Sequence, residues 1–277
     1  MPFSDWQTIR KGQHDQATVA VDFGPARFRR LFARLDTGGA VVGPTFAAPG
    51  DDAMRATDPA RLVRDWLDDL AEGSLRTRVV VGYCAGAAMT LALADALTRA
   101  GGTAPAVVLL DPVVSGLDVL LSYYSSSVHT FAEILPGDER AAWISTAQQA
   151  LPSVSPSRSG PDAADLVRAM AVLCDAYSGM VSSVVDRMGI GAPQATYFTN
   201  RFGGLMSYLV VNARAGLDPL PSGRPPVVVV SREHEPPPML SADLERLSVD
   251  QAGLLADPGV ADALARVSPD RWPGVPS

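Results

Sequence analysis

Cysteine, lysine and histidine are scarce in this sequence, and each shortage excludes a class of protein. Two cysteines, Cys84 and Cys174, in 277 residues are too few for a disulfide framework, and neither has the spacing of a metal-ligand set. Lys11 is the only lysine and the net charge is −7, which argues against general affinity for nucleic acid. We therefore expect no structural metal and no nucleic-acid partner.

Long apolar runs are also missing. None approaches the roughly 18 residues that span a bilayer, and residues 1–6 lead into polar sequence without the apolar core of a signal peptide. We expect a soluble, cytoplasmic protein with no membrane partner. The chain is nevertheless 47% hydrophobic, so it can bury a full core, and α/β chains of this length often form one domain.

Short β-branched runs alternate with helical patterns, and each run has the length of a buried parallel strand. These runs cover residues 17–22, 40–46, 78–83, 106–111, 226–231 and 246–250. The clearest helix opens at Asp58 and Pro59, a capping residue followed by a proline at the first helical position. Its apolar residues share one face, and they are Leu62, Val63, Trp66, Leu67 and Leu70. The alternation predicts βαβ units and a mostly parallel sheet flanked by helices.

The alternation stops between residues 113 and 216. Here the sequence is helical, and the stretches 162–188 and 196–215 are rich in Met, Tyr and Phe. An apolar helical insertion between two late strands predicts a lid over a site, inside a single domain that covers residues 1–277. A plain helical subdomain is the alternative.

The segment Gly82-Tyr83-Cys84-Ala85-Gly86 joins a predicted strand to a helix start rich in small residues. This is the context of a nucleophile elbow, in which glycines let strand and helix approach a strained nucleophile. The helix N-terminus favours a thiolate at Cys84, and the backbone N–H of Ala85 would form half of an oxyanion hole. A small buried cysteine in a tight turn is the alternative.

Two further candidates lie at or just after the ends of predicted strands. Phe23 or Gly24, after the run 17–22, is the expected position of the second oxyanion-hole donor. Asp111 ends the run 106–111 at the sheet edge where open α/β sheets build their sites. There it would orient a catalytic base, or it would simply cap the turn before Pro112.

The sequence has only three histidines, which limits where that base could come from. His234 follows the run 226–231 on the same sheet edge, although between Glu233 and Glu235 it would also suit a solvated loop. His129 falls in the helical insertion and would reach the site as part of a lid. His14 precedes the run 17–22 and is expected on the surface.

The elbow, Asp111, the helical insertion and the tail 248–267 together resemble the thioesterases that release products from polyketide and nonribosomal peptide synthetases. Because the nucleophile position holds cysteine, the chain looks more like the thioesterase-like Dieckmann cyclases of antibiotic biosynthesis, which close tetramate or pyridone rings. The resemblance implies an α/β-hydrolase fold with a helical lid and no cofactor. It also implies an acyl or peptidyl carrier protein as partner, with the substrate bound to its phosphopantetheine arm.

The sequence departs from this resemblance at one position. The family's histidine is expected just after the last strand, where Gln251 stands. Glutamine forms hydrogen bonds but does not accept a proton near neutral pH. The usual base is therefore absent from this position, whether by natural divergence or by replacement.

Three functions fit these residues. A thiolate exchanges readily with a thioester and leaves more easily than an alkoxide, so Cys84 predicts acyl transfer followed by carbon–carbon ring closure. A hydrolytic editing thioesterase is the second reading. The third is a non-catalytic protein that binds carrier proteins or acyl chains, which Gln251 favours. The arginine-rich segment 25–34 would suit an acidic carrier protein in each case, or it is a solvated helix face.

Overall fold

The computed structural model describes residues 6–12, 16–24, 28–34, 39–46, 53–151, 162–217, 225–240 and 243–267. The chain divides into two compact units. The first is built from Met1–Thr45, Pro59–Val114 and Ala215–Ser277, and the second from Phe46–Asp58 and Ser115–Arg214. No helix in the described ranges is both long enough and apolar enough to cross a bilayer.

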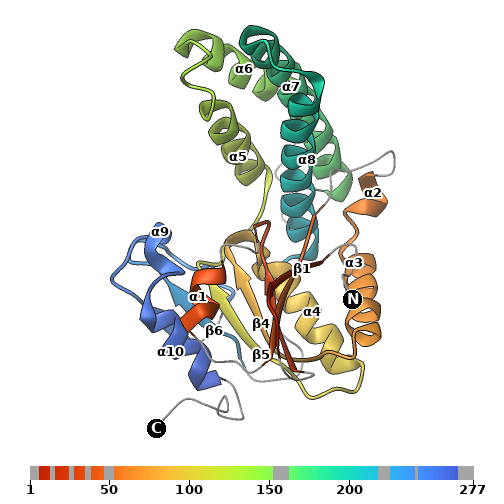
Figure 1. The fold of residues 1–277 in the computed structure, drawn as a ribbon, viewed down its shortest axis with the longest axis vertical. Coiled ribbons are helices and arrows are strands. Elements are labelled where there is room, and N and C mark those ends of the chain that lie inside the picture. Colours follow the sequence, from red (N-terminus) through yellow and green to blue (C-terminus); the bar gives the residue numbers. More distant parts are fainter. Residues whose placement is uncertain are drawn as a thin grey trace. The chain divides into compact units, whose positions relative to one another are not determined.

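The first unit is organised around a sheet. Within the described residues it has seven strands in the order β1-β3-β2-β4-β5-β6-β7. Figure 1 shows this sheet with helices on either side. The strands are β1 (Trp6–Arg10), β2 (Gln16–Val21), β3 (Ala40–Pro44), β4 (Arg76–Tyr83), β5 (Ala106–Leu110), β6 (Val227–Val230) and β7 (Asp243–Arg246). β1 runs antiparallel to β3, and the other neighbouring strands run parallel. The prediction of a mostly parallel sheet is therefore confirmed.

The two edge strands are where the sequence prediction failed. β1 was not predicted, because its place in the sheet depends on distant contacts: Trp6 Nε1 donates to Asp69 Oδ2 at 2.8 Å, and Arg10 Nη1 donates to the Phe32 carbonyl at 2.9 Å. The strand expected at 246–250 was wrong, since β7 ends at Arg246. β7 is short and largely exposed, so it lacks the apolar run that marks the buried strands.

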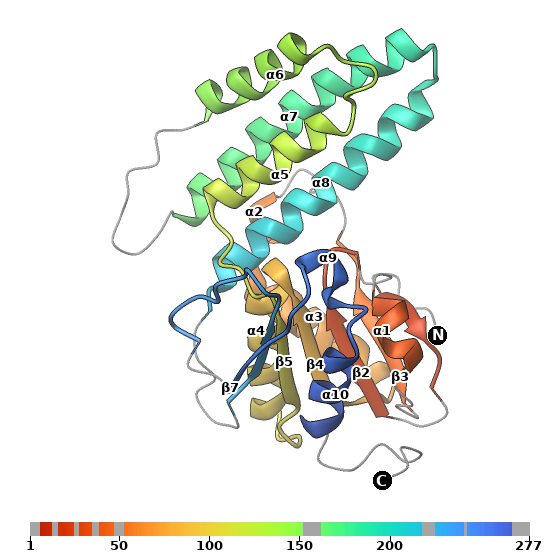
Figure 2. The same cartoon turned by 90° about the vertical axis from the view of Figure 1, so that its left-hand side faces the viewer.

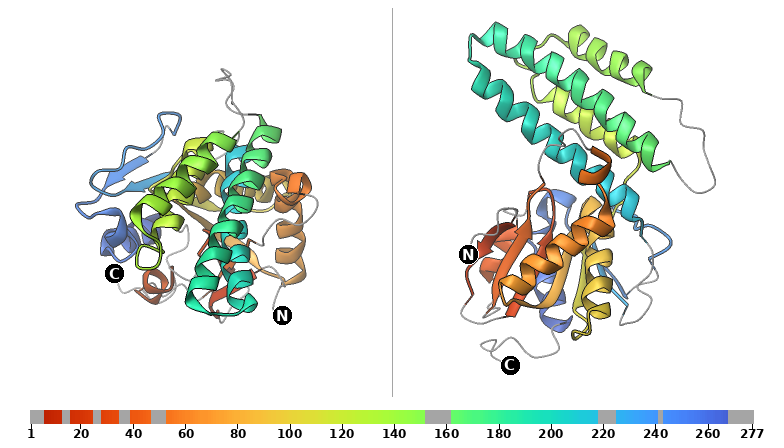
Figure 3. Two further views of the ribbon diagram at one scale, coloured as in Figure 1. Left: turned by 90° about the horizontal axis from the view of Figure 1, so that it is seen from above. Right: turned by 90° about the vertical axis from the view of Figure 1, so that its right-hand side faces the viewer.

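Helices cover both faces of this sheet. α3 (Pro59–Glu72) and α4 (Ala87–Arg99) pack on one face, while α1 (Arg29–Arg34) and α10 (Pro258–Val267) pack on the other (Figures 2 and 3). α3 is the helix predicted after Asp58, and it buries Val63, Trp66 and Leu70.

The alternation of β4 directs its side chains to these two layers. Val79, Val81 and Tyr83 join the core that contains α1 and α10, whereas Gly82 faces Thr90 of α4. β4 lies in the interior of the sheet, between β2 and β5. Its carboxyl end therefore sets Cys84 at the middle of one sheet edge.

The second unit is helical in its described part. It contains α2 (Ala53–Ala56), α5 (Leu117–His129), α6 (Gly137–Ala150), α7 (Ala163–Met188) and α8 (Ala192–Ala215), and Figure 2 shows the long helices side by side. The helices expected over 162–188 and 196–215 correspond to α7 and α8. Arg214 Nη1 donates to the Met54 carbonyl at 2.8 Å and to Thr57 Oγ1 at 2.9 Å, which joins the distant segment 46–58 to this unit.

Aromatic rings form much of the core of this helical unit. Tyr177 and Phe202 stack with ring centroids 4.0 Å apart, and Tyr124 meets Phe202 edge to face. Burial raises the pKa of both Tyr124 and Tyr177 to about 12, with Arg201 partly offsetting the effect at Tyr177. The neutral phenols are therefore the forms that suit this core.

These raised pKa values predict how stability depends on pH. Above pH 10, the ordinary pKa of tyrosine, the unfolded chain ionises Tyr124 and Tyr177 while the folded chain keeps them protonated up to about pH 12. Their contribution to the free energy of unfolding is therefore complete below pH 10 and is lost as the pH rises toward 12. Urea unfolding followed by circular dichroism measures this free energy. Between about pH 9 and about pH 11.5 the free energy of unfolding should fall less in Tyr177→Phe than in the wild type. The control is Tyr197→Phe at a 61% exposed position, and a loss as small in that variant would contradict the assignment to Tyr177.

Candidate active site

Cys84 occupies a strained turn between β4 and α4. Its backbone φ is +54°, in the left-handed region that non-glycine residues rarely adopt, and it opens the 3-10 turn Cys84–Gly86. A residue held in this region costs on the order of 1–3 kcal/mol, and such residues cluster at functional sites. The side chain of Cys84 is partly exposed while Ala85 and Gly86 are buried, so the turn presents a thiol on a buried backbone.

Gly82 and Thr90 make this turn possible. A Cβ atom on Gly82 would lie 2.3 Å from Thr90 Oγ1 and 3.2 Å from Ala87 Cα, so only glycine lets α4 pack this close to β4. The same Thr90 hydroxyl donates to the Gly86 carbonyl at 2.8 Å. The small-residue pattern of the sequence thus has a steric cause.

The carbonyl of Cys84 joins the turn to the neighbouring strand. It accepts the N–H of Ala87 at the start of α4, and it also accepts the N–H of Val113 at 3.2 Å. Val113 follows the end of β5. The backbone of Cys84 is therefore held from both sides.

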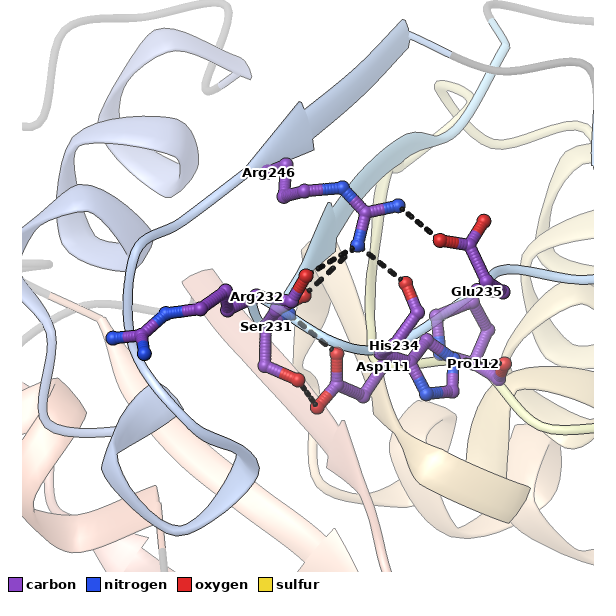
Figure 4. A network of polar contacts seen from close by, with 7 residues as sticks. All are labelled: Asp111, Pro112, Ser231, Arg232, His234, Glu235 and Arg246. Atoms are coloured by element: carbon purple, nitrogen blue, oxygen red, sulfur yellow. Dashed lines mark hydrogen bonds and ion pairs between the residues drawn. The ribbon is translucent and has the colours of Figure 1, made fainter.

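Asp111 is fully buried at the end of β5, and its φ of +44° is also in the left-handed region. Both carboxylate oxygens accept hydrogen bonds from Ser231: the N–H of Ser231 donates to Oδ1 at 2.7 Å, and its hydroxyl donates to Oδ2 at 2.8 Å (Figure 4). The N–H of Asp111 donates to the Val229 carbonyl at 3.0 Å. In this structure the carboxylate is thus held by a serine at the end of β6.

His234 lies in the turn that follows Ser231. Its Nε2 is 2.9 Å from the carbonyl oxygen of Pro112, and because a carbonyl can only accept, Nε2 carries the hydrogen. In the neutral ring Nδ1 is then the acceptor. The ring is half-buried and in contact with the residue after Asp111 (Figure 4), so it is not a fully solvated loop histidine.

Gln251 begins the short helix α9 (Gln251–Leu254) after β7. The side chain of Gln251 is exposed. Its backbone carbonyl oxygen lies 3.5 Å from the hydroxyl of Tyr83, the residue before Cys84. Asp250 caps the helix by accepting the N–H of Gly253 at 2.8 Å. Gln251 stands where the resemblance implies a histidine. Its backbone therefore lies beside the elbow, but its side chain is an amide and not a base.

The expected oxyanion-hole donors follow two neighbouring strands. β2 and β4 are parallel neighbours with Val21 opposite Gly82. Phe23 and Cys84 each lie two residues beyond this pair, so Phe23 and Ala85 belong to the same sheet edge. Their position agrees with the expected role, which remains a prediction for both residues.

His129 ends α5 in the helical unit and is exposed, and His14 lies outside the described residues. Sequence reasoning missed Ser231, although its place at the end of the predicted strand 226–231, on the same sheet edge as Asp111, was the signal that would have found it.

This architecture was compared with known proteins by sequence and by structure. The sequence matches no protein-family model and no curated protein. Among solved structures, the chain is similar to the four-domain nonribosomal peptide synthetase AB3403 bound to AMP and glycine, with a TM-score of 0.58, 13% identity and coverage of 96% of this chain. It is also similar to the type II thioesterase BorB from the borrelidin biosynthetic cluster, with a TM-score of 0.52, 12% identity and 97% coverage of each chain.

The chain has the α/β-hydrolase fold. The parallel sheet, its flanking helices and these neighbours all agree on it. The chain spans only 20% of the length of the synthetase. At identities this low the likeness establishes the fold, and function has to be argued from the residues at the sheet edge.

Because Gly82 lies so close to Thr90, a methyl group added at Gly82 should lower the free energy of unfolding. Gly82→Ala should destabilise the protein by about 1–3 kcal/mol through overpacking. Gly179→Ala in α7 is the matched control, because its Cβ would lie 3.4 Å from Trp143, an ordinary contact. That change should be neutral or stabilise by up to about 1 kcal/mol. Urea denaturation measures both, and equal effects would refute the steric explanation.

The two thiols should differ in reactivity. Burial, with a smaller contribution from Asp175, raises the pKa of Cys174 to about 12, so at about pH 8 almost all of it is the unreactive thiol. Iodoacetamide should therefore label Cys84 first, and peptide mass spectrometry should locate the label. Cys84→Ser should abolish the fast phase of iodoacetamide labelling, and Cys174→Ser should leave that phase unchanged. Faster labelling of Cys174 would contradict this assignment.

Proposed function

We propose that this protein is a cysteine-dependent acyl-transfer enzyme that takes a carrier-bound acyl chain onto Cys84 and releases it by Dieckmann cyclisation to a tetramate or pyridone. The observation that carries the proposal is the partly exposed thiol at φ +54°, between the interior strand β4 and the start of α4. A nucleophile elbow has this geometry. An acyl or peptidyl carrier protein with a phosphopantetheine-bound substrate is the proposed partner, and no cofactor is required.

In the first half-reaction the thiolate of Cys84 attacks the thioester carbonyl of the substrate. A new carbon–sulfur bond forms to Cys84, the phosphopantetheine thiolate leaves, and it takes up a proton. The backbone N–H groups of Ala85 and of Phe23 are the proposed donors to the tetrahedral oxyanion. The parallel pairing of β2 with β4 supports this assignment, because it brings both residues to one sheet edge.

In the second half-reaction an acidic methylene of the bound chain loses a proton, and its carbanion attacks the acyl-Cys84 carbonyl. A carbon–carbon bond forms and the Cys84 thiolate is expelled. Cysteine suits this step because a thiolate leaves more easily than an alkoxide. The helical insertion of residues 113–216 is the proposed lid, whose task would be to keep water from the acyl group.

The methylene proton needs an acceptor, and Gln251 cannot serve because an amide is not a base near neutral pH. We assign this role to His234. Its Nε2–H is engaged by the Pro112 carbonyl, which supports Nδ1 as the accepting nitrogen. Asp111 receives two hydrogen bonds from Ser231, and its proposed task is to hold the turn that carries His234.

Hydrolytic editing is the second candidate function. BorB, a type II thioesterase of similar fold, supports thioester chemistry in general, and water would then replace the carbanion as the attacking group. A non-catalytic carrier-binding role is the third, and the amide of Gln251 supports it. The products separate these functions.

The deciding experiment uses intact-protein mass spectrometry with a β-ketoacyl-aminoacyl thioester. The wild type and Gln251→His should form an adduct that Cys84→Ala does not form, and Cys174→Ser is the matched control that should retain it. The released product should be lighter by one water than the free acid. Release of the acid would favour the editing thioesterase. If neither the wild type nor Gln251→His formed an adduct, covalent catalysis would be excluded and the binding role favoured.

A further inference from the structure

Arg246 at the end of β7 holds the turn that follows β6. Its Nη1 donates to three backbone carbonyls, those of Ser231 at 3.2 Å, Arg232 at 2.9 Å and His234 at 2.7 Å. Its Nη2 forms an ion pair with Glu235 at 3.1 Å. Figure 4 shows the guanidinium with these oxygens gathered around it. One side chain thus binds most of the turn at residues 231–235.

The carbonyl bonds are the important part of this arrangement. Oxygens that converge on one point repel one another unless a cation lies between them, and hydrogen bonds from a charged donor are roughly twice as strong as neutral ones. The ion pair contributes little by comparison, because the side chain of Glu235 is 86% exposed and exposed pairs are weak. Removal of the guanidinium should therefore let the turn relax.

This turn carries both groups that contact the end of β5. Ser231 donates two hydrogen bonds to Asp111, and His234 donates one to the Pro112 carbonyl. We propose that Arg246 is a positioning residue, which fixes the turn so that Ser231 holds the Asp111 carboxylate and His234 keeps its ring against β5.

The turn is also tied to the segment that precedes α9. The N–H of Arg232 donates to the Val249 carbonyl at 2.8 Å, and its Nε donates to the Ser248 carbonyl at 3.2 Å. The N–H of Leu247 donates to the Val230 carbonyl at 2.8 Å. A displaced turn would therefore also disturb the segment that leads to Gln251.

The kinetic consequence of this inference rests on the proposed function, whereas its structural consequence rests on the hydrogen bonds alone. Arg246 is assigned no contact with substrate, so its loss should act on the chemical step and leave substrate binding unchanged. Misplacement of catalytic groups by about 1 Å can cost up to about 100-fold in rate. The expected signature is a reduced kcat with an unchanged KM.

The test compares Arg246→Met with Arg266→Met in the full-length protein. Arg266 is the matched control, because it is an exposed arginine in the last turn of α10 that forms an ion pair with Glu245, the neighbour of Arg246 in β7. Imidazole ¹⁵N NMR should show a changed Nε2–H signal for His234 in Arg246→Met, assigned with His234→Gln, and no change in Arg266→Met. Amide exchange at His234, whose N–H donates to the Ser231 carbonyl, should also become faster.

The kinetic arm measures release of the cyclised product from the thioester used above. In Arg246→Met, kcat should fall at least about tenfold with KM within about twofold of the wild type, and Arg246→Lys, which keeps a cation with three donors, should recover much of kcat. If Arg246→Met does not fold, Arg246→Gln replaces it. The proposal would be overturned if Arg246→Met showed unchanged His234 signals and the same kcat as Arg266→Met. If the wild type forms no Cys84 adduct the proposed function fails, and the NMR comparison still decides whether Arg246 holds the turn.

Discussion

The buried carboxylate of Asp111 is the constraint on which the rest of the sheet edge depends. An ionised carboxylate without partners is costly inside a protein, so its surroundings must supply donors in fixed places. Ser231 supplies two of them, which joins β5 to β6. Val113 connects β5 back to the carbonyl of Cys84, and Arg246 connects β6 to β7. Four neighbouring strands, β4 to β7, thus end in one hydrogen-bonded series that runs from the backbone of Cys84 to the turn of His234.

Two residues at this sheet edge have a strained backbone. Cys84 and Asp111 both have positive φ values, and each begins the segment that leaves an interior strand. The hydrogen bonds of Cys84 and Asp111 with Val113, Val229 and Ser231 offset the cost of this strain. Strain of this kind persists where the surroundings determine the conformation, which is typical of sites that hold reactive groups.

Local sequence patterns predicted the interior of the sheet and the elbow, because a buried strand and a small-residue turn each leave a signature within a few residues. The edge strands left none: β1 depends on Trp6 reaching Asp69, and β7 is mostly exposed. Likewise Ser231 carries no recognisable motif, since its role arises only because β5 and β6 are paired in register. The union of segment 46–58 with the helical unit is also a long-range effect, made through Arg214.

The composition of β7 has a consequence for how copies of this protein meet. An edge strand offers unpaired backbone groups to any other strand, and proteins commonly prevent such pairing with short, charged edges. β7 is four residues long, and three of them, Asp243, Glu245 and Arg246, are charged. Because Arg246 is engaged with the turn and Glu245 with Arg266, these charges are held in place along the strand. Short, charged edges of this kind disfavour the pairing of one sheet with another.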